Sequence, residues 1–451
     1  MNNRGNFGSR IGLVLATAGS AVGLGNIWRF PFTTGQNGGA AFIIIYIICI
    51  LMLGLPGMIS EFIIGRHAAT NAVRAYGVIS GKRVWRVVGV MGILCSTIIL
   101  GFYSVVAGWC LQYLYASVAG QIKGDSDYVA RYFTEFSSDI AMPVVWAMVF
   151  IIITHFVIVK GVRKGIEKAS KLMMPTLFVL LLIIVAASCM LPNAISGIKF
   201  LFYPNFSKLS SNVMLEALGQ AFFSLSLGTA CLCTYSSYFS KRTNLVNAAL
   251  QIALIDTMIA VLAGLMIFPA AFSVGVKPDA GPSLIFITLP NVFQQAFASM
   301  PLVGYVISIL FYALLALAAL TSTISMHEIG TAFFHEELKR PRRHAAWIVT
   351  VTAIMIAIVS SLSCGAYPQL TVFGMSMMDF FDFLTANILL PAGALLTCVY
   401  VGWVVPRSTV MTEFTNRHTV CIKLFPAFLF MVRFVCPICI TLVFLHQFGI
   451  V

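Results

Sequence analysis

The chain alternates between long apolar runs and short basic segments along almost its whole length. A helix that spans a bilayer needs about 20 mostly apolar residues, because its rise is about 1.5 Å per residue. We therefore predict eleven spanning helices, over residues 10–33, 40–65, 87–119, 142–160, 169–191, 213–239, 245–272, 303–333, 345–365, 380–404 and 423–448. The apolar segment 280–300 contains Pro282 and Pro290, so we interpret it as a re-entrant or hairpin loop.

The composition supports a polytopic membrane protein. Of the 451 residues, 59% are hydrophobic and only 10% are charged, and the mean hydropathy is +0.95. Soluble domains carry roughly 25% charged residues, so a soluble enzyme, a disordered chain and a secreted disulfide scaffold are excluded. At least eight of the 11 cysteines lie in apolar runs, and no disulfide framework is evident. Cys436 and Cys439 have the spacing of a redox motif, but their apolar surroundings favour a packing role.

The basic residues predict the orientation. Of the 28 Lys and Arg residues, 21 lie in loops on the same side as the N-terminus, and five lie on the other side. Cytoplasmic loops carry the excess of positive charge, so we predict a cytoplasmic N-terminus in the plasma membrane. An odd number of spans then leaves the C-terminus extracellular. The net charge of +13 is thereby explained without nucleic acid. We expect the first apolar stretch to belong to the bundle, not to a cleaved signal peptide.

Two spans contain sequences that disfavour a regular helix. The first has Gly19, Gly23 and Gly25 within seven residues, and each costs about 1 kcal/mol relative to alanine. The sixth has a hydroxyl-rich stretch around Gly228. Unwound backbone inside a membrane is tolerated where it lines a cavity. The alternative interpretation is close helix packing through small residues.

These two spans are the first members of two sets of five. Interrupted helices at corresponding positions of two halves are typical of transporters built from inverted repeats. We therefore predict a single transporter domain over 1–451, with a first repeat at 10–191, an inverted repeat at 213–404 and an extra helix at 423–448.

Four ionisable residues lie in otherwise apolar spans: Arg29, Glu61, Asp256 and Glu328. Such groups cost at least about 2.5–3.5 kcal/mol to insert and mark functional sites. Arg29 and Glu61 have a second interpretation as a buried structural pair. Asp256 is either protonated or faces a cation. The hydroxyl run Thr321–Ser325 would suit a hard cation such as sodium, which prefers oxygen ligands.

Several of these segments resemble the motifs of a known transporter family. Residues 10–12 and 19–31 closely resemble the first helix of the neurotransmitter:sodium symporter family, in its bacterial amino-acid transporter branch. The resemblance covers essentially the whole chain and continues at Asn37–Phe42, Lys164–Lys168, Phe223–Gly228 and Leu320–Ser322. It implies an all-α membrane protein with the leucine-transporter fold, which imports amino acids or related amines with sodium by alternating access.

The resemblance implies two sodium sites. The first would use the Ala21 carbonyl, Asn26, Ser224, Asp256 and the substrate carboxylate. The second would use the carbonyls of Gly19, Val22 and Ala318 with the hydroxyls of Thr321 and Ser322.

It also implies a substrate site between the interrupted helices. Its residues would be Ser20, Ala21, Leu24, Gly25, Ile99, Tyr103, Phe223, Ser224, Ser226, Thr229, Ser322, Ser325 and Met326. The Tyr103 hydroxyl and the amides of Leu24 and Gly25 would bind the substrate carboxylate, and Phe223 would act as a lid. The outer gate would be Arg29 with Asp382, or with Asp379 one turn earlier. The inner gate would be Arg4 with Glu336, beneath Tyr238.

A departure from relatives and the composition of the expected pocket refine the expected function. Animal relatives that need chloride carry Asn in place of Asp256 and Ser in place of Ala260, so we expect chloride-independent transport. A pocket walled by Ile99, Thr229 and Met326 favours a medium to large neutral amino acid, aromatic ones included.

The sequence leaves open a channel, a non-transporting receptor and an integral-membrane enzyme. The seven scattered histidines lack metal-ligand spacing, so an enzyme is not favoured. We expect the partners to be the amino acid and membrane lipid, with the protein a monomer or homodimer.

Overall fold

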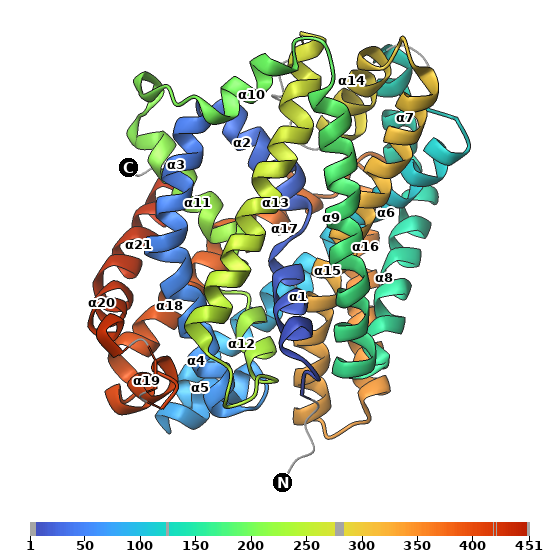
Figure 1. The fold of residues 1–451 in the computed structure, drawn as a ribbon. Coiled ribbons are helices and arrows are strands. Elements are labelled where there is room, and N and C mark those ends of the chain that lie inside the picture. The colour runs from blue at the N-terminus through green and yellow to red at the C-terminus, as the bar shows by residue number, and fades with distance from the viewer. Residues whose placement is uncertain (1–5, 123–125, 276–283, 418, 421, 449–451) are drawn as a thin grey trace.

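The computed structural model describes residues 6–122, 126–275, 284–417, 419–420 and 422–448. Within these residues the chain is almost entirely helical, and long helices pack side by side into one bundle around a continuous apolar core (Figure 1). The strands in the described part are the antiparallel pair β1 (Thr371–Val372) and β2 (Met375–Ser376).

The described residues of the first half of the chain form ten α-helices. They are α1 (Arg10–Ala21), α2 (Phe30–Gln36), α3 (Ala40–Cys49), α4 (Leu55–Ala68), α5 (Ala72–Ser80), α6 (Arg86–Val118), α7 (Ser126–Ser138), α8 (Met142–Val159), α9 (Lys168–Cys189) and α10 (Ala194–Phe202). Shorter helical segments join or extend them: η1 (Gly25–Arg29), η2 (Ile50–Gly54), η3 (Arg83–Trp85) and η4 (Val162–Glu167).

The second half supplies eleven more. They are α11 (Ser211–Ser224), α12 (Cys231–Ser236), α13 (Leu245–Ser273), α14 (Leu289–Ala296), α15 (Pro301–Glu337), α16 (Arg342–Ser363), α17 (Met377–Phe383), α18 (Leu390–Val399), α19 (Arg407–Phe414), α20 (Phe425–Phe430) and α21 (Cys436–Gln447). The joining segments are η5 (Phe206–Lys208), η6 (Leu284–Thr288), η7 (Leu384–Leu389), η8 (Tyr400–Val404), η9 (Ile422–Leu424) and η10 (Met431–Val435).

In the described part, nine helices are long and apolar enough to cross a membrane. A tenth crossing is a bent pair, because α1 and the segment 25–36 meet at 58°. The sixth predicted span consists of α11 and α12, which are separated by residues 225–230 and are each shorter than a crossing helix. The count of eleven spans therefore stays a prediction.

Two segments differ from the sequence-based expectation. The fifth predicted span begins at Val162 rather than at residue 169, because the π-helical segment η4 precedes α9 without a break. The segment predicted as a re-entrant or hairpin loop contains helix: η6 and α14 run on without a break, with Pro290 in the first turn of α14, where a missing N–H is tolerated. Pro282 lies outside the described residues.

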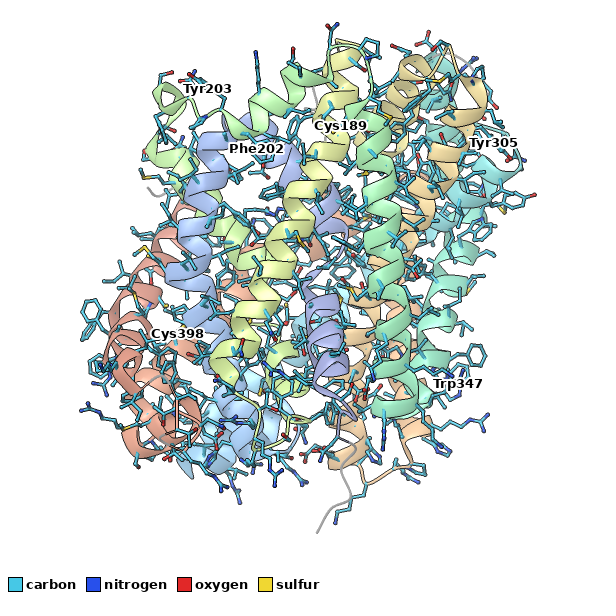
Figure 2. The ribbon with its side chains drawn as sticks, in the orientation of Figure 1. Cys189, Phe202, Tyr203, Tyr305, Trp347 and Cys398 are labelled. Carbon is cyan, nitrogen blue, oxygen red and sulfur yellow. The ribbon has the colours of Figure 1, made fainter. Side chains whose placement is uncertain are left out.

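The outer surface of the bundle suits a bilayer. Large apolar side chains such as Leu172, Leu254 and Met355 are exposed on its flank. Figure 2 shows Tyr305 near one end of the bundle and Trp347 towards the other, both pointing outward. Aromatic residues are enriched at both membrane interfaces, so these positions agree with a transmembrane bundle.

The broken helix α1 lies at the centre of the bundle (Figure 1). It packs against α9, α13 and α15, while α12 packs against α4. Both interruptions are therefore surrounded by protein, which is where irregular backbone is tolerated at membrane depth.

Candidate functional site

The first interruption follows directly from the glycine-rich sequence. The helix α1 ends at Ala21, and Val22 has extended backbone with φ −71° and ψ 112°. Helical geometry resumes at Leu24, directly before η1. The last carbonyls of α1 consequently lack helical donors and are available to other groups. The Asn26 side chain stabilises the interruption, because its Oδ1 accepts a 3.1 Å hydrogen bond from the Gly23 amide.

The second interruption has backbone that only a few residues adopt easily. Ser226, Gly228 and Ala230 all have positive φ, at 53°, 84° and 61°. Gly228 also approaches α18 so closely that a Cβ there would lie 2.3 Å from the Leu390 carbonyl oxygen. Glu61 on α4 accepts hydrogen bonds from the amides of Gly228 and Cys233, which lie on either side of the start of α12. Glu61 thus binds the broken helix, and its interpretation as a buried partner of Arg29 is wrong.

The structure brings together three of the residues expected at the first sodium site. Asp256 Oδ1 accepts a 2.7 Å hydrogen bond from Asn26 Nδ2, and Asp256 Oδ2 accepts a 2.8 Å bond from the Ser224 hydroxyl. Tyr46 adds a third donor at 3.4 Å. No Lys, Arg or His of the described chain forms an ion pair with Asp256, which is fully buried. A buried carboxylate with no basic partner, beside a hydroxyl oxygen, fits a hard monovalent cation, whereas the Asn26 amide turns its nitrogen towards this group and its oxygen towards Gly23. Ala21, whose carbonyl would join them, is the last residue of α1.

The residues of the second expected site also meet. The Thr321 hydroxyl lies 3.1 Å from the Val22 carbonyl and 2.8 Å from the Ala318 carbonyl, and the Ser322 hydroxyl lies 3.2 Å from Val22 O. A Cβ on Gly19 would lie 3.3 Å from Thr321 Cβ, so Gly19 lines the same spot. This set of carbonyl and hydroxyl oxygens suits sodium without any carboxylate.

Between the two sets lies the predicted substrate site. The Leu24 amide donates a 3.0 Å hydrogen bond to the Tyr103 oxygen, which leaves the Tyr103 hydroxyl proton for another acceptor. Gly25 faces Phe223, since a Cβ on Gly25 would lie 3.0 Å from that ring. The Ser226 hydroxyl lies 3.3 Å from the Ser20 carbonyl. The two broken helices, α6 and α15 therefore meet at the predicted substrate site.

The hydroxyls of Ser20, Thr229 and Ser325 at the predicted substrate site are already bonded to backbone. Thr229 Oγ1 donates to the Ser226 carbonyl and accepts from the Cys231 amide. Ser325 Oγ donates to Ser322 O, and Ser20 Oγ donates to Thr17 O. With Ile99 and Met326, these residues offer a mainly apolar wall. Sequence reasoning missed the Cys231 thiol, which contacts the hydroxyls of Ser20 and Ser325.

One residue of the predicted outer gate lies against Phe223. The Arg29 guanidinium is centred 4.1 Å from the Phe223 ring. No ion pair within 4 Å joins Arg29 to Asp382 in the described chain, although the charge of Asp382 acts on Arg29. Asp379 instead caps α17 with Ser376, whose hydroxyl donates to it at 2.7 Å. The pairing of Arg29 with Asp382 stays a prediction.

At the other end of the site, Arg4 lies outside the described residues, so its pairing with Glu336 stays a prediction. Glu336 accepts hydrogen bonds from the Thr70 hydroxyl and the Asn71 amide. The Tyr238 hydroxyl donates to Glu328 at 2.7 Å, and Glu328 forms an ion pair with Arg342.

Sequence reasoning missed this Glu328–Arg342 pair, because the partners lie on different helices and share no motif. His327 does not contact Glu328 through its ring nitrogens; it bonds Thr331 and Thr350.

Comparisons with known proteins agree with this geometry. The model of the sodium:neurotransmitter symporter family matches residues 4–126 and 120–450. The sodium-dependent transporter YhdH of Bacillus subtilis is 39% identical over 448 residues, which is 98% of each chain. A sodium-dependent transporter of Haemophilus influenzae is 33% identical over 457 residues, also 98% of each chain.

A solved structure has a similar fold. The crystal structure of MhsT in complex with L-phenylalanine superimposes with a TM-score of 0.89 at 39% identity, and covers 99% of this chain and all of the other. The bundle therefore has the fold of a sodium-coupled membrane transporter, and an enzymatic role is excluded by the family. The chain belongs to the sodium:neurotransmitter symporter family.

Proposed function

We propose that the chain imports a neutral amino acid of medium to large size, aromatic ones included, together with two sodium ions and without chloride. The observation that carries this proposal is the meeting of Asn26, Ser224 and Asp256 where both helices are interrupted. A buried carboxylate beside free backbone carbonyls favours a cation, and that cation would share its site with the substrate carboxylate.

The substrate class is supported by two observations. The hydroxyls of Ser20, Thr229 and Ser325 are bonded to backbone carbonyls, so the wall presents mainly apolar groups to a side chain. MhsT, which shares the fold, was crystallised with L-phenylalanine. Apolar pockets discriminate by only about 1–3 kcal/mol per methylene, so we propose moderate breadth among neutral amino acids.

Chloride independence is supported by the charge of Asp256. A chloride ion 4 Å from that carboxylate would be opposed by about 4 kcal/mol at an effective dielectric near 20. Ala260, one turn further along α13, has no hydroxyl to offer an anion. Gln220 favours an anion, since its Nε2 is buried without a hydrogen-bond partner in the described chain. Measuring amino-acid uptake with chloride replaced by gluconate tests whether transport needs chloride.

Alternating access would use the two repeats, 10–191 and 213–404, with helix 423–448 outside them. The two broken helices occupy corresponding first positions of these sets, as expected for inverted repeats. Figure 2 supports a cytoplasmic N-terminus and an extracellular C-terminus, because nitrogen-tipped side chains gather at the end of the bundle where α1 begins. We propose that the gates are Arg29 with Asp382 outside and Arg4 with Glu336 inside.

A thermal-shift assay in detergent tests the ligand. A ligand at about 100 times its Kd stabilises the folded state by about 2.7 kcal/mol, which raises the Tm measurably. We expect phenylalanine or leucine to raise the Tm in sodium but not in potassium, and Tyr103→Phe to remove that rise. A channel or a sodium-independent receptor would give equal shifts in both salts, or none.

A further inference from the structure

Arg433 is a basic residue inside the last apolar helix, and transport does not use it. The helical run from Ile422 to Gln447 is long and apolar enough to cross a bilayer. Arg433 lies about 17 Å along it, from a rise of about 1.5 Å per residue. Helical side chains tilt towards the N-terminus of their helix, so its guanidinium reaches back towards the end of the bundle where α1 begins. There it meets Gly402 and Trp403 at the end of η8.

The two helices satisfy each other's backbone at this point. Helix η8 ends at Val404, so the Gly402 carbonyl has no helical donor, and Pro437 has no N–H to give to the carbonyls one turn earlier in η10. Arg433 Nε donates to the Gly402 carbonyl at 2.6 Å, and Trp403 Nε1 donates to the Arg433 carbonyl at 3.4 Å. The exchange is reciprocal, and it fixes the arginine side chain across the helix pair.

Gly402 permits this close approach. A Cβ there would lie 3.0 Å from Arg433 Cγ and 3.3 Å from Arg433 Cα. The guanidinium carbon also lies 5.2 Å from the centre of the Trp403 ring. Carbonyl, ring and glycine together hold the guanidinium in one orientation, which is the pre-organisation that a binding site requires.

Four of the five guanidinium N–H donors remain available. In the described chain, Nη1 and Nη2 of Arg433 have no hydrogen-bond partner, and no carboxylate lies within 4 Å. The neighbouring side chains are exposed and apolar: Trp403 is 58% exposed, Phe434 44% and Ile438 59%. These helices form one flank of the bundle (Figure 1). The flank therefore presents a fixed cation within an apolar surface.

We propose that Arg433 and Trp403 bind the phosphate of an anionic phospholipid in the leaflet at this end of the bundle. Guanidinium groups bind phosphate oxygens in a bidentate manner, and tryptophan is typical of the headgroup level. A second copy of the chain fits this flank poorly. Segments 384–404 and 422–447 contain no Asp or Glu, so a twofold interface here would place arginine against arginine. The depth assigned to the site rests on the proposed orientation in the membrane.

Native mass spectrometry of the purified full chain tests the site. The protein is titrated with phosphatidylglycerol and with phosphatidylcholine of the same acyl chains, and the bound lipids are counted. We expect the wild type to prefer phosphatidylglycerol by about tenfold, and Arg433→Gln, which keeps one donor for Gly402, to lose most of that preference. Lys423→Gln removes the same charge from an exposed position at the start of this helical run and should keep the preference.

Equal binding of both lipids by the wild type, or equal losses in the two variants, would overturn the proposal. So would loss of a dimer in Arg433→Gln with unchanged lipid preference. If Arg433→Gln does not fold, Trp403→Phe removes the indole N–H and leaves a smaller ring beside the guanidinium, and it should reduce the preference by about threefold; an unchanged preference contradicts the site. Because lipid counting does not depend on amino-acid binding or uptake, its failure is distinct from a failure of the transport function.

Discussion

The Glu61 carboxylate accepts a 2.8 Å hydrogen bond from the backbone amide of Gly228, inside the interruption between α11 and α12. Its second oxygen lies 3.2 Å from the Cys233 amide, so one side chain replaces helical partners that the interruption has removed. Glu61 itself is buried on α4. The unwound segment is therefore held in place by a neighbouring helix.

Glu61→Gln should weaken this support. The new amide group can accept at only one of the two positions, and a buried unsatisfied donor costs about 1–3 kcal/mol. We expect a lower Tm in detergent and amino-acid affinity reduced by about tenfold, measured by radioligand binding in sodium. Glu135→Gln, an exposed position on α7, is the matched control. Wild-type affinity in Glu61→Gln would contradict the supporting role.

Thr321→Val tests the second sodium site. Valine keeps the shape but removes the hydroxyl that lies beside Val22 O and Ala318 O. Loss of one oxygen ligand should raise the sodium concentration for half-maximal amino-acid binding by about tenfold, which corresponds to about 1.4 kcal/mol. Thr352→Val alters an exposed position on α16 and should leave that concentration unchanged. Equal sodium dependence in both variants would exclude Thr321 as a ligand.

Gly23→Ala should block the substrate site without unfolding the bundle. The added Cβ would lie 2.5 Å from Ser322 Oγ and 3.0 Å from the Tyr103 oxygen, where the substrate carboxylate is expected. We expect amino-acid binding to fall below detection in the radioligand assay. Gly219→Ala on α11 is the control, because its Cβ would meet nothing closer than 3.9 Å and should stabilise the helix by about 0.4–1 kcal/mol. Normal binding by Gly23→Ala would refute the placement.

The contacts of Glu413, which lies outside the membrane spans, predict that the protein loses stability in acid. Burial alone would raise its pKa, but the hydrogen bond with His67 and the charges of Arg66 and Lys241 outweigh it and lower the pKa to about 2. Arg66 Nε lies 2.6 Å from Glu413 Oε2. An unfolded Glu titrates near about 4.3, so the stabilisation is complete above that pH and is lost as the pH falls towards about 2.

Glu413→Gln should consequently lower the Tm at neutral pH, by an amount that reflects about 1.5–3 kcal/mol for a hydrogen bond to a charged group. The difference between wild type and variant should shrink below about pH 4.5 and vanish near about pH 2. Differential scanning fluorimetry across this range measures it. A difference that stays constant with pH would mean that the ionised carboxylate contributes nothing.

Much of the fold follows from the sequence, because hydrophobic run length alone locates helices in a bilayer. The interruption after Ala21 could be predicted from three glycines, and Asp256 from its charge in an apolar run. Contacts between distant helices could not be predicted, since the residues next to Glu61 or Arg433 in the sequence do not indicate which helix each side chain contacts. The bond from Arg433 to Gly402 depends on how η8 and η10 pack, which one sequence does not encode in its periodicity.

The most direct test of sodium-coupled import is uptake of labelled phenylalanine into proteoliposomes with an inward sodium gradient. We expect saturable accumulation above the external concentration in sodium gluconate as well as in sodium chloride, and none in potassium. Asp256→Asn removes the buried charge and should reduce uptake by about tenfold or more. Accumulation that is equal in potassium, or that disappears in gluconate, would contradict the role assigned to Asp256 and the two broken helices.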